Sequence, residues 1–196
     1  MNVRPNPRYT EFVSRIRNMS PKPAEWAGVT FRSVELEHAS AEQILSGAGS
    51  FKFGGRWNAP GSFPVVYSST GPGTAVEEAF QPAADYMLAP DDLKPRLTCG
   101  IEWDLSRVVD LTRSNLPAWL ELEDWMKENF LRINDSGFET LCQAFGRAAR
   151  NCGVNALLCP SVRVHDGINL VVFRDRLRAS DNMRLLGEEE LKQHLV

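Results

Sequence analysis

Apolar and polar residues alternate along several short stretches of this chain, and these stretches predict strands. Residues 29–36 alternate and are rich in β-branched side chains, as expected for a half-buried strand. Residues 64–69 form a short apolar run bounded by turn residues, which is typical of a buried strand. The same criteria predict strands over residues 97–105, 108–111, 154–159 and 168–174, with a turn at Ser106 and Arg107 between the first two.

Helices are predicted where apolar residues recur every three or four positions. Residues 117–133 carry such a stripe, and residues 137–151 form a second predicted helix. A capping box of Ser40 and Gln43 opens a short helix that stops near Gly47. Shorter helices are predicted at residues 74–80 and in a polar tail from Glu188.

The order of these elements favours an α+β fold. Strands and helices do not alternate regularly along the chain, which argues against a doubly wound parallel sheet. We expect one or two small antiparallel sheets in a single domain over residues 27–196, including a helical tail at 181–196. Residues 1–26 mix prolines with arginines and form a predicted N-terminal arm, and residues 82–95 form a predicted loop.

Composition narrows the class of protein. The net charge of −3 and the isoelectric point of about 5.7 argue against a general nucleic-acid binder. The apolar runs are far shorter than the roughly 20 residues of a membrane helix, and no apolar signal segment opens the chain. The four cysteines form no C-x-x-C pair, so we expect no metal site. These features predict a cytoplasmic protein that binds neither a nucleic acid nor a membrane directly.

Arginine dominates the basic residues, with 17 arginines against 5 lysines. A guanidinium binds phosphate or carboxylate through two parallel hydrogen bonds, whereas an ammonium acts as a point charge. The bias therefore has two explanations, which are a genome rich in G and C and a site for an anion.

Two arginines lie where an anion would find a binding site. Arg32 stands inside the first predicted strand, so it needs an anionic partner or a salt bridge at a sheet edge. Arg56 lies in the segment Gly54-Gly-Arg-Trp-Asn58, where glycines allow close backbone approach and Trp57 offers a flat ring face. A tight turn with a surface arginine and a buried tryptophan explains the same segment.

Two further places combine polar side chains with the end of a strand. Tyr67 ends a buried strand, and Glu77 and Glu78 follow in the next helix, where either a pocket or the helix dipole explains them. Ser161 follows Pro160 after another buried strand, which exposes its hydroxyl and backbone N–H groups or simply forms a turn. None of the usual dinucleotide, P-loop or nucleophile-elbow fingerprints occurs in the chain.

The order of these motifs is more specific than each motif alone. Along the chain stand F-R, G-G-R-W-N-x-P-G, V-V-Y-S-S, A-V-E-E, G-V-N-A-L-L-C-P-S and N-L-V-V-F. This order resembles the RES domain, a family named for its arginine, glutamate and serine, over about residues 29–175. Such proteins are the toxins of bacterial toxin–antitoxin pairs whose antitoxins belong to the Xre helix-turn-helix group.

The resemblance implies a fold and a set of site residues. The implied fold is similar to that of ADP-ribosyltransferases, with two small, mainly antiparallel sheets that form a cleft for NAD and helices that flank them. The family arginine, glutamate and serine fall on Arg32, Glu78 and Ser161, which are the implied catalytic residues. Glu77 is the alternative for the acid. The implied NAD contacts are Arg32, Arg56, Trp57, Asn58, Tyr67 and Ser161.

The activity that the resemblance implies is NAD breakdown by hydrolysis or phosphorolysis. The bond between nicotinamide and ribose breaks through an oxocarbenium-like transition state, which a carboxylate such as that of Glu78 stabilises. The guanidinium groups of Arg32 and Arg56 suit the pyrophosphate, and the ring of Tyr67 suits nicotinamide. NAD is then the substrate, and neither a cofactor nor a metal is implied.

Two other functions stay open at this point. The same site serves an ADP-ribosyltransferase that modifies a host protein, and a domain that binds partners without catalysis is the third hypothesis. The implied partners are NAD and an Xre-type antitoxin. Self-association into a homo-oligomer, through the tail or through residues 119–125, is a further option.

Overall fold

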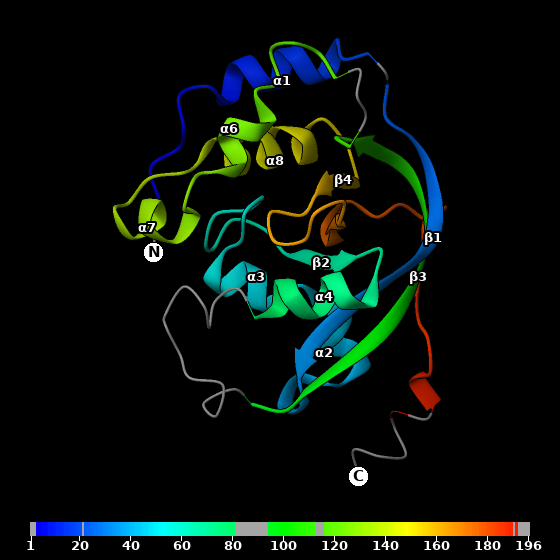
Figure 1. Ribbon diagram of the computed structural model, residues 1–196. Coiled ribbons are helices and arrows are strands. Elements are labelled where there is room, and N and C mark those ends of the chain that lie inside the picture. Colours follow the sequence, from blue (N-terminus) through cyan, green and yellow to red (C-terminus); the bar gives the residue numbers. More distant parts are fainter. Residues whose placement is uncertain (1–2, 21, 81–93, 113–115, 190, 192–196) are drawn as a thin grey trace.

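The computed structural model describes residues 3–20, 22–80, 94–112, 116–189 and 191. They form a mixed α+β fold in which helices pack against one six-stranded sheet (Figure 1). Most of the predicted loop at 82–95 and of the tail after Glu188 lies outside the described residues. None of the described helices is long and apolar enough to cross a bilayer.

Five of the strands close a hydrogen-bonded ring. The sheet has the order β1-β2-β5-β4-β3-β6, and β1 pairs with β3 in addition. Only β3 and β4 run parallel, and the other described pairs are antiparallel. The strands are β1 (Ala24–Glu35), β2 (Val65–Ser69), β3 (Arg96–Asp110), β4 (Ala156–Pro160), β5 (Ile168–Phe173) and β6 (Asn182–Leu185).

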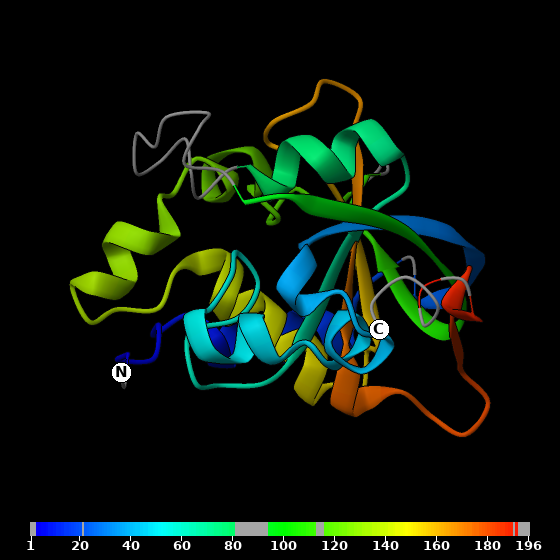
Figure 2. The ribbon, with the colours of Figure 1, turned by 90° about the horizontal axis from the view of Figure 1, so that it is seen from below.

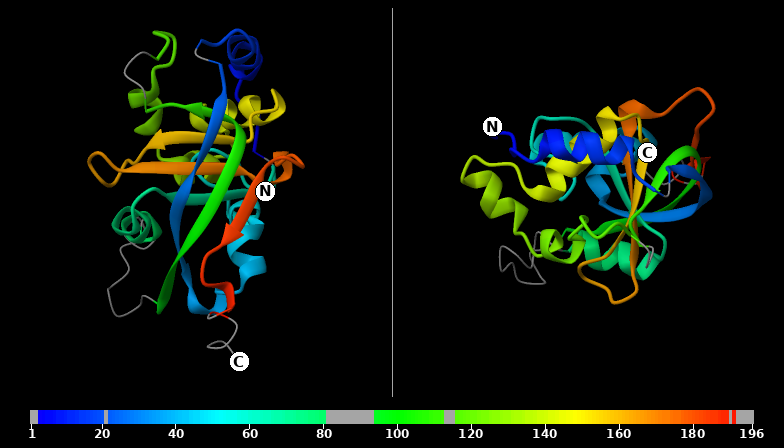
Figure 3. Two further views of the ribbon diagram at one scale, coloured as in Figure 1. Left: turned by 90° about the vertical axis from the view of Figure 1, so that its right-hand side faces the viewer. Right: turned by 90° about the horizontal axis from the view of Figure 1, so that it is seen from above.

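Two long strands explain why there is one sheet where two small ones were expected. β1 has 12 residues and β3 has 15, and they pair with each other along most of that length. Both strands run across β2, β4 and β5 (Figure 3). Phe31 of β1 pairs with Ser69 of β2, and the end of β3 pairs with β4, so hydrogen bonds join all the strands.

The predicted turn inside β3 is wrong. Ser106 and Arg107 continue the strand because side chains accept their backbone N–H groups. The Ser106 N–H donates to Asp181 Oδ1 at 2.8 Å, and the Arg107 N–H donates to Asn155 Oδ1 at 3.2 Å. These acceptors come from distant segments, so no local pattern announces them.

The structure departs from the predicted helices at three places. Residues 48–53 form a helix that was not predicted, and residues 182–185 of the predicted helical tail at 181–196 instead form strand β6, because they pair with residues 101–104 of β3. The predicted helix over residues 117–133 is two short helices, α6 (Leu122–Met126) and α7 (Phe130–Asp135). The side chain of Asn129 accepts the Arg132 N–H and so caps the start of α7. Arg56 donates to the carbonyls of Met126 and Glu128, at the end of α6 and just after it. The α-helices are α1 (Tyr9–Arg17), α2 (Ala41–Ser46), α3 (Ala48–Phe53), α4 (Pro72–Ala79), α6 (Leu122–Met126), α7 (Phe130–Asp135) and α8 (Leu141–Asn151), with 3-10 helices η1 (Leu36–His38) and η3 (Arg174–Arg176).

Local signals place the confirmed elements well. The side chain of Ser40 accepts the Gln43 N–H at 3.2 Å, and Gly47 ends α2 in the left-handed region with φ of 70°. The predicted strands at 29–36 and 168–174 correspond to β1 and β5. Such signals depend only on neighbouring residues.

The N-terminal segment packs on the domain. Helix α1 lies along α8 (Figure 3), and Phe12 is fully buried in the core beside Phe145 and Trp125. Arg147 of α8 binds Glu139 at 2.7 Å and stacks over the ring of Tyr9 at 3.8 Å. The predicted arm therefore contributes to the core, and β1 begins at its end.

A buried polar chain crosses the centre of the sheet. Trp103 Nε1 donates to Thr30 Oγ1 at 2.7 Å, and the Thr30 hydroxyl donates to Ser68 Oγ at 2.8 Å. The Ser68 hydroxyl reaches the Leu170 carbonyl at 3.4 Å. This chain links β3, β1, β2 and β5, so it fixes the crossing strands against one another.

Candidate active site

The carboxylate of Glu78 lies where two distant segments meet. Glu78 sits on α4, and the loop between β4 and β5 lies beside that helix (Figure 2). Glu78 Oε1 accepts hydrogen bonds from Ser161 Oγ at 2.6 Å and from Asn169 Nδ2 at 2.7 Å. Glu77 is exposed, whereas Glu78 is partly buried. Of the two predicted acids, the structure therefore directs Glu78 toward Ser161.

The loop that carries Ser161 is closed by its own backbone. The Ser161 N–H donates to the Gly167 carbonyl at 2.7 Å, and the Ser161 Oγ accepts the N–H groups of Arg163 and Val164 at 3.0 Å each. A Cβ on Gly167 would lie 3.0 Å from carbons of Ser161, Thr74 and Val164. The glycine therefore lets this loop lie directly on α4.

Arg32 presents a buried donor without a partner. Its Nη1 donates to the Tyr67 carbonyl at 2.7 Å, and its Nε is buried with no hydrogen-bond partner. Burial lowers the pKa of the Arg32 guanidinium, and the positive charge of Arg96 adds to that effect. Within the described part of the chain, no carboxylate forms a salt bridge with Arg32. A partly buried cation of this kind suits an anionic ligand.

Arg56 borders a hollow that also reaches the loop of Ser161. Its Nη1 donates to the carbonyls of Met126 at 2.8 Å and Glu128 at 3.2 Å, and its guanidinium lies 5.8 Å from the ring centre of Phe130. These contacts fix the side chain from one side. The hollow has a volume of about 260 Å³ and is lined by Arg56, Met126, Lys127, Glu128, Asn129, Phe130, Val162 and Arg163.

Tyr67 is partly buried beneath the loop that holds Arg56. Its hydroxyl accepts the Trp57 N–H at 2.9 Å and donates to Asn58 Oδ1 at 2.8 Å, and burial raises its pKa. A Cβ on Gly55 would lie 2.6 Å from the Tyr67 hydroxyl oxygen, so the glycine makes room for the ring. The side chains of Trp57 and Asn58 are 1% and 0% exposed and hold the loop from within.

Two residues of the site had no predicted role. Asn169 is the first residue of the N-L-V-V-F motif, and its place in that motif is the one sequence signal that could have identified it. Gln143 of α8 is fully buried, and its Nε2 donates to the Gly55 carbonyl at 2.9 Å. Its capping box with Thr140 predicts the start of a helix, yet no neighbouring residue predicts its contact with the loop that holds Arg56.

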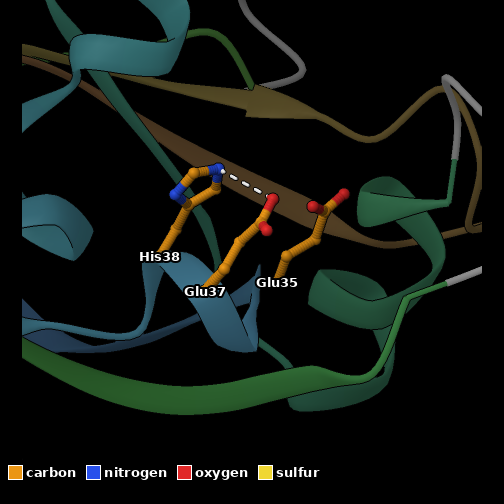
Figure 4. A group of neighbouring side chains, drawn as sticks. All are labelled: Glu35, Glu37 and His38. Atoms are coloured by element: carbon orange, nitrogen blue, oxygen red, sulfur yellow. Dashed lines mark ion pairs between the residues drawn. The ribbon is translucent and has the colours of Figure 1, made fainter.

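A charged group at the end of β1 and in η1 lies outside these contacts. The possible ligand atoms of Glu35, Glu37 and His38 lie within 4.8 Å of one another (Figure 4). Lys94 Nζ is 2.7 Å from Glu37 and 3.6 Å from Glu35, and Arg96 is also 3.6 Å from Glu35. The two cations already balance the carboxylates, so the group is a surface charge network.

The contacts of the site bring Glu78 of α4 and the loop of Ser161 together, and Arg32 lies on β1, which contacts α4. The family model of the RES domain matches residues 30–191, so the chain belongs to the RES domain family. The NAD(+) phosphorylase MbcT of Mycobacterium tuberculosis strain ATCC 25618 / H37Rv is 31% identical over 151 residues, which is 76% of this chain and 73% of that protein. The protein of the same name from Mycobacterium bovis shows the same identity and coverage.

A solved structure is similar along nearly the whole chain. It is the crystal structure of the M. tuberculosis MbcT–MbcA toxin–antitoxin complex, with a TM-score of 0.61 and 26% identity. The match covers 93% of this chain and 95% of the chain in that complex.

Proposed function

We propose that this protein is the toxin of a toxin–antitoxin pair and that it degrades NAD by cleaving the bond between nicotinamide and ribose. The observation that carries the proposal is the anchored carboxylate of Glu78 in a chain 31% identical to NAD(+) phosphorylase MbcT. The enzyme is thus a NAD-consuming glycosyltransferase, and inorganic phosphate is the acceptor that its similarity to a phosphorylase favours.

In this proposal, the arginines hold the dinucleotide. Arg32, with its unpartnered Nε, and Arg56, at the edge of the hollow, bind the pyrophosphate through charge-assisted hydrogen bonds. The ring of Tyr67 supports the nicotinamide. Trp57 and Asn58 act through the loop, because their side chains are buried. The cleft then works as in ADP-ribosyltransferases, with NAD held extended across the crossing strands.

The reaction depends on stabilising the positive charge that develops on the ribose, and it needs no general acid to protonate the leaving group. The electron pair of the C–N bond goes to the nicotinamide ring, which leaves neutral without protonation. The ribose becomes oxocarbenium-like, and the carboxylate of Glu78 stabilises that charge. A phosphate oxygen then bonds to the ribose carbon and gives ADP-ribose 1-phosphate. Ser161 acts through Glu78, since its hydroxyl proton is directed to that carboxylate.

The proposed partner is an Xre-type helix-turn-helix antitoxin that covers the cleft. The similarity to a solved toxin–antitoxin complex supports such a partner. The cytoplasm is the proposed compartment, because the NAD pool lies there and the buried free thiols of Cys142 and Cys159 suit a reducing environment.

A nicotinamide-release assay tests the proposal. Purified protein is incubated with NAD, with and without inorganic phosphate, and we expect release that depends on phosphate. Glu78→Gln should lower the rate by roughly a hundredfold or more, because the charge that stabilises the transition state is lost. Glu77→Gln is the matched control on the same helix and should keep the wild-type rate, since Glu77 is exposed.

Other products identify other functions. Release of free ADP-ribose without phosphate would make the enzyme a glycohydrolase, and a labelled protein band from labelled NAD would make it an ADP-ribosyltransferase. Absence of nicotinamide release under all these conditions, with Glu78→Gln as toxic to cells as wild type, would contradict the proposal.

A further inference from the structure

We propose that Asn169, held by Ser69, is a positioning residue that orients the carboxylate of Glu78 for the reaction. The inference rests on the proposed function and deepens it, because it assigns a role to a side chain outside the arginine, glutamate and serine signature. Asn169 acts through Glu78 and needs no contact with the substrate.

Asn169 is fixed on both sides of its amide. Its Nδ2 donates to Glu78 Oε1 at 2.7 Å, and its Oδ1 accepts the Ser69 hydroxyl at 2.7 Å. A carboxylate only accepts hydrogen bonds, so the amino group of the amide must face Glu78. The Ser69 hydroxyl then donates to the remaining oxygen. The side-chain amide of Asn169 therefore has one orientation between Glu78 and Ser69.

The backbone under Asn169 is equally fixed. Asn169 lies in β5, where it pairs with Ser69 of β2 on one side and with Cys159 of β4 on the other. Ser69 is 2% exposed. A strand paired on both sides moves less than a loop. Asn169 thus gives Glu78 an anchor on the rigid part of the fold, and Ser161 adds one from the adjoining loop.

The two anchors act on the same carboxylate oxygen. The Ser161 Oγ accepts two backbone N–H groups, so its own proton is left to donate to Glu78 Oε1. Among the described residues, no donor binds Glu78 Oε2. The carboxylate is therefore clamped through Oε1, which leaves Oε2 to face the ribose where positive charge develops.

Steady-state kinetics with NAD tests this role. Asn169→Ala should lower kcat by roughly tenfold to a hundredfold, the usual worth of a hydrogen bond to a charged group, and change KM for NAD by less than about threefold. Ser69→Ala should lower kcat in the same direction by about twofold to tenfold. Thr70→Val is the matched control, because its hydroxyl is exposed and bonds the Ile168 carbonyl instead.

A double-mutant comparison separates positioning from plain support of the fold. If Asn169 acts only through Glu78, Asn169→Ala in a Glu78→Gln background should cost no further activity. A structural role would lower the rate by the same factor in both backgrounds, and that result would overturn the inference.

The outcomes separate this inference from the proposed function. If the wild type consumes NAD, Glu78→Gln does not and Asn169→Ala keeps the wild-type kcat, only the role of Asn169 is overturned. If the wild type consumes no NAD, both proposals fail together.

Discussion

Gly167 shows how the absence of one side chain shapes the site. A Cβ there would meet carbons of Ser161, Thr74 and Val164 at 3.0 Å, so Gly167→Ala should push the serine loop away from α4. We expect the NAD-cleaving rate to fall about tenfold with little change in melting temperature. Gly73→Ala, on α4 itself and with open space at its Cβ, is the control and should keep the wild-type rate. Equal losses in the two variants would contradict this explanation.

The site residues differ in how well sequence predicts them. Arg32, Glu78 and Ser161 are site residues that the resemblance to the RES domain implies, and the structure joins the glutamate and the serine by a hydrogen bond. The role of Asn169 depends on the pairing of β2 with β5, which places it beside Ser69. The buried position of Trp57 likewise depends on α8, whose residues Gln143 and Phe145 contact Gly55 and Trp57. From the sequence alone, Trp57 could therefore be either a ligand contact or a core residue.

At the scale of the elements, the carboxylate of Asp181 holds together β3, the residue before β4 and the segment before β6. Asp181 accepts hydrogen bonds from the N–H groups of Ser106 and Arg178 and from Asn155 Nδ2, at 2.6–2.8 Å. Burial alone would raise the pKa of Asp181, but the hydrogen bonds from Arg178, Ser106 and Asn155 hold it below its usual value. Because the pKa is lower in the folded state, the ionised carboxylate stabilises the fold at pH values above the unfolded pKa near 3.8. This stabilisation is lost as the pH falls through the lower pKa of the folded state.

Asp181→Asn should therefore destabilise the protein by about 1 kcal/mol at pH 7, because an amide cannot accept all these hydrogen bonds as a carboxylate does. The difference from wild type should shrink as the pH falls below about 3.8, because the unfolded carboxyl takes up its proton first, and it should be lost as the pH passes the lower pKa of the folded state. Urea denaturation at pH 7 and pH 3 measures both values. A difference that stays the same at the two pH values would show that packing, and not charge, is the cause.

Elements with local signals were predictable, and elements shaped by distant partners were not. Helix α2 follows from Ser40 and Gly47, which both act within a few residues. The helix predicted over residues 117–133 is divided because Arg56, some 70 positions earlier, binds the carbonyls between α6 and α7. β3 is continuous for a similar reason, since Asn155 and Asp181 bond its backbone from far along the chain.

At the scale of the whole molecule, two buried thiols report on the opening of the fold. Cys142 and Cys159 are each 1% exposed, and burial raises the pKa of Cys142 to about 12. At pH 8 only about one Cys142 in 10⁴ is then a thiolate, which is the reactive form. We expect iodoacetamide to modify the partly exposed Cys152 first and to reach Cys142 and Cys159 only in denaturant, as measured by mass spectrometry of peptides. Modification of all these cysteines at one rate in native buffer would contradict the buried placement.

The order of the strands along the chain has a consequence for synthesis. Ser161 and Asn169 stand 83 and 91 residues after the glutamate that they hold. A nascent chain that has emerged from the ribosome only as far as β4 already carries both arginines and the carboxylate, yet it lacks the strand that closes the ring. Such a chain lacks both Ser161 and Asn169, the two side chains that hold the carboxylate of Glu78, so we expect it to cleave no NAD until β5 has been synthesised.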